Sequence, residues 1–210
     1  RNGLGDLVTA LTARLAQQGV ELRTNCQVDA LRVRSHQPGR WMYDLILNDG
    51  SALSAEALVL ATPAYVSAEL LRPLTPIAGG LLDLIPYAST ATVAMAFPAQ
   101  AVAGAVEGFG FIVPRAEARD LIAATWTSLK WPHRAPADQV LSRCYVGGVG
   151  REAILQLNDD QMIAKIRADL AALCGITAEP TYVEVNRWWK AMPQYTIGHL
   201  DRLSQLEAAL

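Results

Sequence analysis

Strand-like segments follow one another through the middle of the chain without a regular helix between each of them. The apolar pattern predicts strands within 89–97, 108–113, 121–128 and 139–147, and a last strand at 181–189. An amphipathic helix is expected over 159–174, because Asp159 and Asp160 suit its positive N-terminus and Gly175 is a natural stop. A doubly wound parallel sheet requires a strict alternation of strands and helices, which this order lacks. The sequence therefore predicts an α+β fold in which helices back a mixed sheet.

The first 62 residues predict a helix, a small sheet and a buried strand, in that order. The helix is expected over 3–18, where apolar residues recur on one face and Gly19 follows as a stop. The continuous apolar run at 57–61 predicts a strand that is buried on both faces. Further helices are expected at 64–72, 76–85 and 199–210.

Composition and motifs exclude several classes of function. Hydrophobic residues make up 51% of the chain, and a net charge of −2 gives no basic surface for nucleic acid. The three cysteines and three histidines are scattered, without a Cys-x-x-Cys or His-x-x-x-His pattern, so no metal site is predicted. The sequence contains no nucleophile elbow and no phosphate-binding loop. Because scattered cysteines give no disulfide framework, a reducing cytoplasm is the expected location.

Three stretches carry a resemblance to a known family. They read GLGDLVTALTARLAQQGVELRTNCQVDAL, EALVLATPAYVSAELL and RWWKAMPQYTIGHLDRL. In this order they resemble the protoporphyrinogen oxidases, which are members of the flavin amine oxidase family, and the likeness covers the whole chain. The first two stretches are shared across amine oxidases and desaturases. AMPQYTIGH and the run from GFGFIVP to WPHRAP point more narrowly to porphyrinogen oxidases.

The resemblance implies a fold of two discontinuous domains, one for the flavin and one for the substrate. Residues 1–62 then belong to a partial FAD-binding domain, 63–190 to the substrate-binding domain, and 191–210 begin the return to the FAD domain. The family's glycine-rich dinucleotide fingerprint and its second flavin motif are expected outside these 210 residues. We therefore expect an internal fragment of a longer enzyme that is colourless and inactive by itself.

The activity implied by the resemblance is the FAD-dependent oxidation of protoporphyrinogen IX to protoporphyrin IX by oxygen, in heme biosynthesis. No residue is a convincing general base, and none is assigned a catalytic role, because hydride transfer is chemistry of the cofactor. Coproporphyrinogen III oxidation, another flavin amine oxidase or desaturase activity, and a non-catalytic tetrapyrrole-binding domain are the alternatives. Relatives are often peripheral membrane proteins, which leaves attachment to the inner face of the membrane and homodimer formation open.

The resemblance also implies which residues approach the flavin. They are Val28, Ala61, Thr62, Pro63 and Trp188. The backbone of a strand edge at Val28 suits hydrogen bonding to adenine, and small side chains at the Ala-Thr-Pro turn let backbone come close. The alternative interpretations are a core valine at position 28, an ordinary strand exit at 61–63 and an aromatic core residue at position 188.

A porphyrinogen is a flat apolar macrocycle with charged propionates at its edge, so it needs an apolar slot with donors confined to the rim. By resemblance, Ile112, Ile122 and Tyr145 line this slot, with Thr125 or Trp126 as replacements for Ile122. Plain sheet core is the alternative for each. Arg134 is interpreted either as a propionate ligand or as a surface arginine in a turn.

Overall fold

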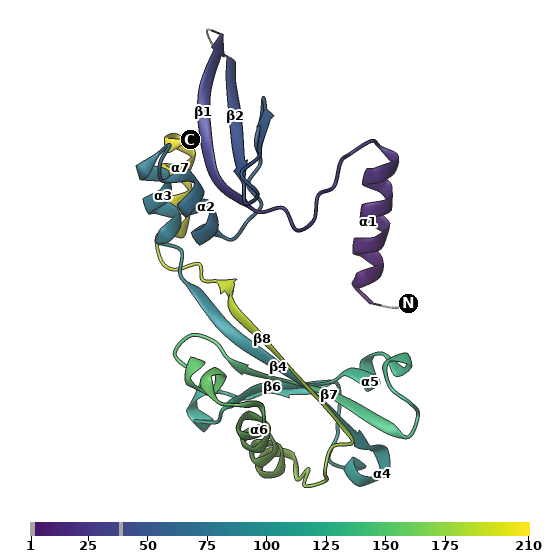
Figure 1. Cartoon of the computed structure of the whole chain (residues 1–210). Coiled ribbons are helices and arrows are strands. Elements are labelled where there is room, and N and C mark those ends of the chain that lie inside the picture. Colours follow the sequence, from purple (N-terminus) through teal and green to yellow (C-terminus); the bar gives the residue numbers. More distant parts are fainter. Residues whose placement is uncertain (1–2, 38–39) are drawn as a thin grey trace. The chain divides into compact units, whose positions relative to one another are not determined.

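The computed structural model of the protein describes residues 3–37 and 40–210 (Figure 1). The chain divides into two compact units. Unit 1 comprises the described residues up to Leu84 together with Leu200–Leu210, and unit 2 comprises Ile85–His199. The sequence-based domain boundaries at 62/63 and 190/191 remain a prediction about the flavin and substrate domains.

Unit 1 contains a small sheet and several helices. Its elements are α1 (Gly5–Gln17), β1 (Val28–Gln37), β2 (Arg40–Leu47), β3 (Ala52–Ala55), α2 (Ala64–Leu71), α3 (Pro76–Asp83) and α7 (His199–Ala209). The three strands pair antiparallel in the order β1-β2-β3, with Leu31 and Leu47 buried. Thr75 accepts a hydrogen bond from the Ala78 N–H at the start of α3 and donates one to the Ala209 carbonyl, which joins α3 to the end of α7.

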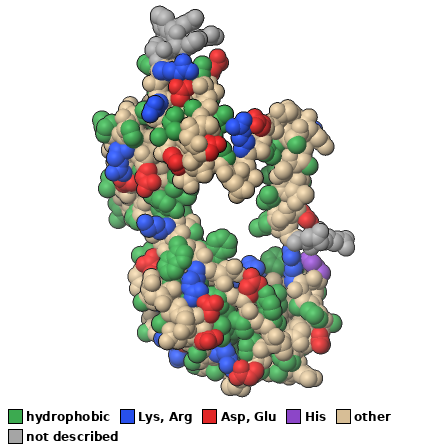
Figure 2. All heavy atoms as spheres, in the orientation of Figure 1, with side chains coloured by type: hydrophobic (Ala, Val, Ile, Leu, Met, Phe, Trp, Pro, Cys, Tyr) green, Lys and Arg blue, Asp and Glu red, His purple; other side chains and the backbone are tan. Residues whose placement is uncertain are grey.

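Helix α1 keeps its apolar residues at the surface. No residue of α1 is buried, and Leu4, Leu7, Val8 and Leu11 are all exposed. Hydrophobic side chains are visible on this helix in Figure 2.

The prediction of a buried strand at 57–61 is wrong. These residues form no strand, and Val59 is 89% exposed. A strand buried on both faces needs a paired neighbour, and none of the described strands pairs with this segment. An apolar run therefore does not form a strand here.

Unit 2 is built around a five-stranded sheet. Its elements are β4 (Tyr87–Pro98), α4 (Ala99–Val102), β5 (Gly110–Ile112), η1 (Arg115–Glu117), β6 (Leu121–Trp126), α5 (Thr127–Lys130), η2 (Pro132–Arg134), β7 (Gln139–Gly147), η3 (Glu152–Gln156), α6 (Asp159–Cys174) and β8 (Tyr182–Pro193). The strand order is β5-β6-β7-β4-β8. The predicted α+β class and the helical backing are confirmed, but every pairing of the described strands is antiparallel rather than mixed. Antiparallel neighbours need no crossover helix between them, which explains the run of strands in the sequence.

Alternation along the strands separates the two faces of this sheet. In β4, Ala91, Val93 and Met95 are completely buried, whereas the residues between them are half-buried. Cys144 and Val146 of β7 are buried on the same face, where they pair with Val93 and Ala91 of β4, respectively. Figure 1 shows α6 lying across this face. The apolar face of β4 and β7 is therefore the core of unit 2.

Helix α6 has clear signals at both ends. Asn158 caps it by accepting a hydrogen bond from the Gln161 N–H, and the Gln161 side chain accepts one from the Asn158 N–H. Gly175 ends the helix with a φ of 71°, in the left-handed region that glycine tolerates best. These caps explain why the sequence predicts both ends of α6 correctly.

Two polar anchors hold the helical layer to the sheet. Arg187 of β8 donates to the carbonyls of Leu155 and Leu157, at 3.2 and 2.8 Å, and forms an ion pair of 2.5 Å with Asp159. Asp169, a buried residue of α6, accepts a 2.9 Å hydrogen bond from the Leu121 N–H. Both anchors satisfy polar groups that burial would otherwise leave unpaired.

We expect Leu170→Ala to lower the free energy of unfolding by about 2–5 kcal/mol, because Leu170 is completely buried and its loss leaves a cavity under the sheet. Leu173→Ala, on the same helix but 36% exposed, is the matched control and should cost less than about 1.5 kcal/mol. Urea unfolding followed by circular dichroism measures both. Equal losses for the two variants would contradict the packing described for α6.

Candidate functional site

The face of the unit 2 sheet that points away from α6 is the candidate site, and we refer to it as the open face. Its side chains alternate with the buried ones along each strand. They are Ile112 on β5, Ala123 and Thr125 on β6, Arg143 and Tyr145 on β7, Thr92 and Ala94 on β4, and Glu184, Asn186 and Trp188 on β8. The side chains on β6 and β4 are small, so the face is low on either side of the larger Arg143 and Tyr145 of the central strand β7.

Strand register brings two predicted substrate residues into one row across the open face. Ile112 pairs with Ala123, and Ala123 pairs with Tyr145. Adjacent strands lie about 4.8 Å apart, so the backbones of Ile112 and Tyr145 are separated by about 10 Å with only a methyl group between them. A flat apolar ligand fits such a row.

The exposure of Ile112 excludes the interpretation that it is a residue of the sheet core. Its side chain is 80% exposed, so Ile112 is not sheet core within the described residues. Tyr145 is half-buried on the open face. A role for either residue in substrate binding stays a prediction.

Ile122 and its two replacements are placed differently from one another. Ile122 is half-buried at an irregularity in the pairing of β6 with β7, between Leu121 and Ala123. Thr125 lies on the open face, whereas Trp126 is 1% exposed in the core on the other face. Of the two replacements, only Thr125 therefore shares a face with Ile112 and Tyr145.

A hollow of about 400 Å³ lies on the β4 and β8 side of the open face. Thr92 and Ala94 form its floor, with Arg143 on one side. Glu184, Asn186 and Trp188, the last of them 53% exposed, are on the other side. Aromatic, cationic and anionic groups therefore line one small depression.

The two charged residues of this hollow, Arg143 and Glu184, do not form an ion pair with each other. The Asn186 amide donates a 2.9 Å hydrogen bond to the Glu184 carboxylate, and the Tyr182 hydroxyl donates another. These bonds hold the pKa of the Glu184 carboxyl below its ordinary value. Arg143 is exposed, and it has no ion pair among the described residues.

Sequence reasoning does not single out Arg143. The signal that identifies it is the alternation in LSRCYVGG, because a buried Cys144 places Arg143 and Tyr145 together on the opposite face. Arg134, the arginine that the sequence suggests as a propionate ligand, is an exposed residue of η2 outside the sheet.

The residues predicted to approach the flavin lie in both units. Val28 begins β1 and is half-buried opposite Leu47. Ala61, Thr62 and Pro63 form an exposed segment before α2, where the hydroxyls of Thr62 and Ser67 are 2.7 Å apart. These four residues belong to unit 1 and Trp188 belongs to unit 2. Their role in flavin binding stays a prediction.

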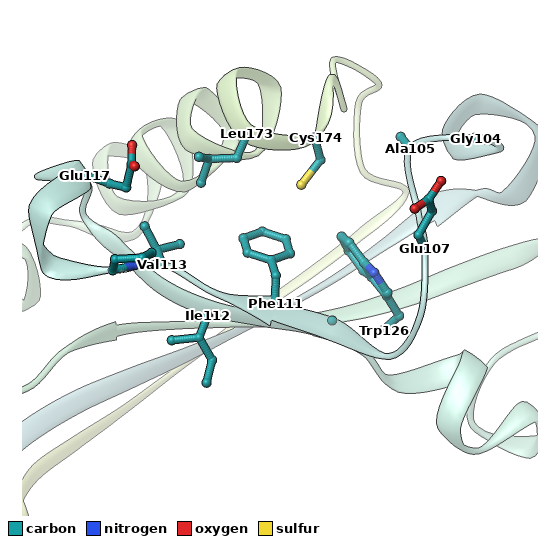
Figure 3. Close-up of a pocket in the computed structure, with 12 residues that line it drawn as sticks. Gly104, Ala105, Glu107, Phe111, Ile112, Val113, Glu117, Trp126, Leu173 and Cys174 are labelled. Atoms are coloured by element: carbon teal, nitrogen blue, oxygen red, sulfur yellow. The ribbon is translucent and has the colours of Figure 1, made fainter.

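A second cavity, of about 540 Å³, lies on the other side of β5, between this strand and the end of α6 (Figure 3). Phe111 and Trp126 line it with their rings 6.0 Å apart, and Cys174 points its sulfur into it. The side chain of Ile112 points away from this cavity in Figure 3, which agrees with its place on the open face.

Neither a metal-binding cluster nor a membrane-spanning helix is found among residues 3–37 and 40–210. These residues contain no cluster of His, Cys, Asp or Glu that is suited to hold a metal ion. None of the helices in this part of the chain is long and apolar enough to cross a membrane.

Comparison with known proteins gives consistent relatives. The sequence profile of the family described as flavin containing amine oxidoreductase matches residues 1–209. The chain is 37% identical over all 210 residues to a coproporphyrinogen III oxidase from Propionibacterium freudenreichii subsp. freudenreichii. It is 38% identical over 80% of its length to a coproporphyrinogen III oxidase from Bacillus subtilis. The chain spans 38% and 35%, respectively, of the length of these two relatives.

A solved structure has the same fold. It is assigned as a protoporphyrinogen oxidase from Exiguobacterium sp. 255-15 and superposes with a TM-score of 0.80 at 30% identity. The match covers 96% of this chain and 43% of that one.

The register that defines the open face predicts the reactivity of Cys144. Burial raises the pKa of its thiol to about 12, so on the order of one molecule in ten thousand carries the thiolate at pH 8. We expect iodoacetamide at pH 8 to modify the partly exposed Cys26 well before Cys144 in the native protein. Peptide mass spectrometry measures both, and unfolding in urea should remove the difference. Rapid native labelling of Cys144 would contradict the assignment of faces.

Proposed function

The chain belongs to the flavin containing amine oxidoreductase family, and we propose that it forms part of an FAD-dependent porphyrinogen oxidase of heme biosynthesis. The observation that carries the proposal is the likeness to two coproporphyrinogen III oxidases at 37% and 38% identity. The stretch RWWKAMPQYTIGH, which lies within the aligned sequence, and the apolar row of Ile112, Ala123 and Tyr145 on the open face agree with it. Residues 63–190 are proposed as the substrate-binding domain, with 1–62 and 191–210 belonging to the FAD-binding domain.

We place coproporphyrinogen III ahead of protoporphyrinogen IX as the substrate. The two relatives at 37% and 38% identity act on coproporphyrinogen III by name, whereas the Exiguobacterium protein, assigned as a protoporphyrinogen oxidase, is 30% identical, and the chloroplast protoporphyrinogen oxidases of Oryza sativa and Nicotiana tabacum are 28% and 29% identical. The two candidate substrates share a macrocycle of four pyrrole rings. Protoporphyrinogen IX has vinyl groups where coproporphyrinogen III carries further propionates, so coproporphyrinogen III offers more carboxylates to cationic groups around the slot.

The residues of unit 2 are proposed to position the substrate rather than to exchange protons with it. The small side chain of Ala123 forms the floor of the slot, and Ile112 and Tyr145 form its apolar sides. Such a surface orients the macrocycle and excludes water from it. Ile122 is proposed to contribute to the same slot from β6.

The residues proposed to hold FAD have surroundings that fit this role. β1 is an edge strand of its sheet, so alternate backbone groups along it point away from β2 and are available to an adenine ring. Ala61, Thr62 and Pro63 are exposed and small enough to let a ligand approach their backbone. Trp188 offers an exposed indole face. When bound, a flavin supplies the acceptor for hydride removed from the substrate.

Oxygen as the electron acceptor and a cytoplasmic location complete the proposal. The choice of oxygen rests on the resemblance, and the cytoplasmic location rests on the absence of a disulfide framework in the sequence.

The direct test uses the intact enzyme that contains this chain. We expect it to purify with bound FAD and to convert coproporphyrinogen III to fluorescent coproporphyrin III while consuming oxygen. The 210-residue polypeptide alone should be colourless and inactive, because a ligand stays bound only if its remaining contacts outweigh the cost of immobilising it. Absorbance spectra and porphyrin fluorescence measure both. A yellow intact enzyme that oxidises no porphyrinogen would refute the proposed substrate.

A charge in the slot is expected to lower turnover without affecting folding or flavin content. Ile112→Asp in the intact enzyme should lower porphyrinogen turnover by about 10-fold or more, because a carboxylate facing an apolar ring loses its hydration. Since Ile112 is 80% exposed, the melting temperature and flavin content should stay close to those of the wild type. Val149→Asp, at another exposed apolar position of unit 2, is the control. Unaltered turnover in Ile112→Asp would show that β5 does not line the slot.

A further inference from the structure

We propose that Arg143, with Thr125 beside it, binds a carboxylate of the substrate at the edge of the apolar slot. The inference rests on the proposed function and deepens it by assigning a specificity-determining residue. Arg143 lies two residues before Tyr145 on β7, so it shares the open face with Tyr145 at a spacing of about 7 Å along the strand. A cation therefore stands one step from the residue predicted to contact the macrocycle.

Register places a second donor next to this cation. Thr125 of β6 pairs directly with Arg143 of β7. The residues before and after each of them are buried in the core, so both side chains point to the open face. Opposed residues of antiparallel strands have Cβ atoms about 5 Å apart. A guanidinium and a hydroxyl at this spacing suit a carboxylate, which accepts hydrogen bonds through two oxygens.

The structural explanation for Arg143 would be an ion pair with Glu184 across β4. Ala94 pairs with Arg143 on one side and with Glu184 on the other, which separates the two backbones by about 10 Å. The Glu184 carboxylate is engaged instead by Asn186 and Tyr182. The positive charge of Arg143 is therefore not matched by an anion among the described residues, and a bound carboxylate would match it.

Other arginines of unit 2 have structural partners. Arg187 is held by two carbonyls and Asp159, Arg167 pairs with Glu179, and Arg119 lies 3.5 Å from Asp169. Arg115 donates to the Val149 carbonyl after β7. Arg143 differs from all four because it rises from the open face itself, beside the row that contains Ile112 and Tyr145.

The test compares Arg143→Gln, Arg143→Lys and Thr125→Val in the intact holoenzyme, with coproporphyrinogen III as substrate. We expect Arg143→Gln to raise KM about 10-fold or more while kcat changes less than about threefold, because a charge-assisted hydrogen bond is lost in the ground state and transition state alike. Arg143→Lys should recover part of the loss, and Thr125→Val should show a smaller rise. Flavin absorbance and melting temperature report whether each variant is folded and loaded.

Methyl esters of the substrate separate this role from a structural one. The wild type should prefer the free acid to the tetramethyl ester in the same detergent, and Arg143→Gln should lose that preference. The control is Arg115→Gln, whose arginine is also exposed but lies outside the open face. An unchanged KM in Arg143→Gln, or an equal rise in Arg115→Gln, would overturn the assignment of Arg143 while leaving the proposed function intact. A wild type without turnover would overturn the proposed function itself.

Discussion

Strand β4 is the element on which unit 2 depends, because it is hydrogen-bonded along both edges. β7 pairs with it from Thr90 to Pro98 and β8 pairs with it from Tyr87 to Ala96. Its alternate residues Ala91, Val93 and Met95 are completely buried, so a slip of one residue would expose the whole apolar set. This penalty fixes the register of both neighbours. The positions of Arg143 on β7 and Trp188 on β8 follow from that register rather than from contacts of their own.

The two faces of the sheet are used for different purposes. Beneath it, Met162, Ile166 and Leu170 of α6 fill the space against the strands, and Arg187 and Asp169 satisfy polar groups at the edges of the layer. On the open face, small residues of β6 and β4 lie on either side of Arg143 and Tyr145 of the central strand β7, and no anion of the described residues pairs with the Arg143 guanidinium. A closed core removes voids and unpaired groups from water, whereas a binding surface needs a depression and free polar groups. The arrangement of the open face is of the second kind.

Arginine illustrates how place decides the role of a residue. Arg187 faces the core side of β8 and donates to the carbonyls of Leu155 and Leu157, so it stabilises the junction of η3 with α6. Arg143 faces the other side two strands away and has its donors directed at the open face. Nothing in the two side chains differs chemically. Because side chains alternate between the two faces of a strand, Arg187 points to the core side and has a structural role, whereas Arg143 points to the open face and is available to a ligand.

The sequence by itself determined the α+β class, the strands of unit 2 and both ends of α6. These depend on local signals, namely the period of apolar residues, Asp159 and Asp160 at the helix N-terminus, and Gly175. It did not determine that the sheet is antiparallel throughout, that 57–61 forms no buried strand, or that Thr125 and Trp126 fall on opposite faces. Only the tertiary structure decided these, because pairing partners far apart in the chain set direction, burial and register. The row of Ile112 and Tyr145, and the place of Arg143 beside it, arise from three strands meeting, which no local pattern encodes.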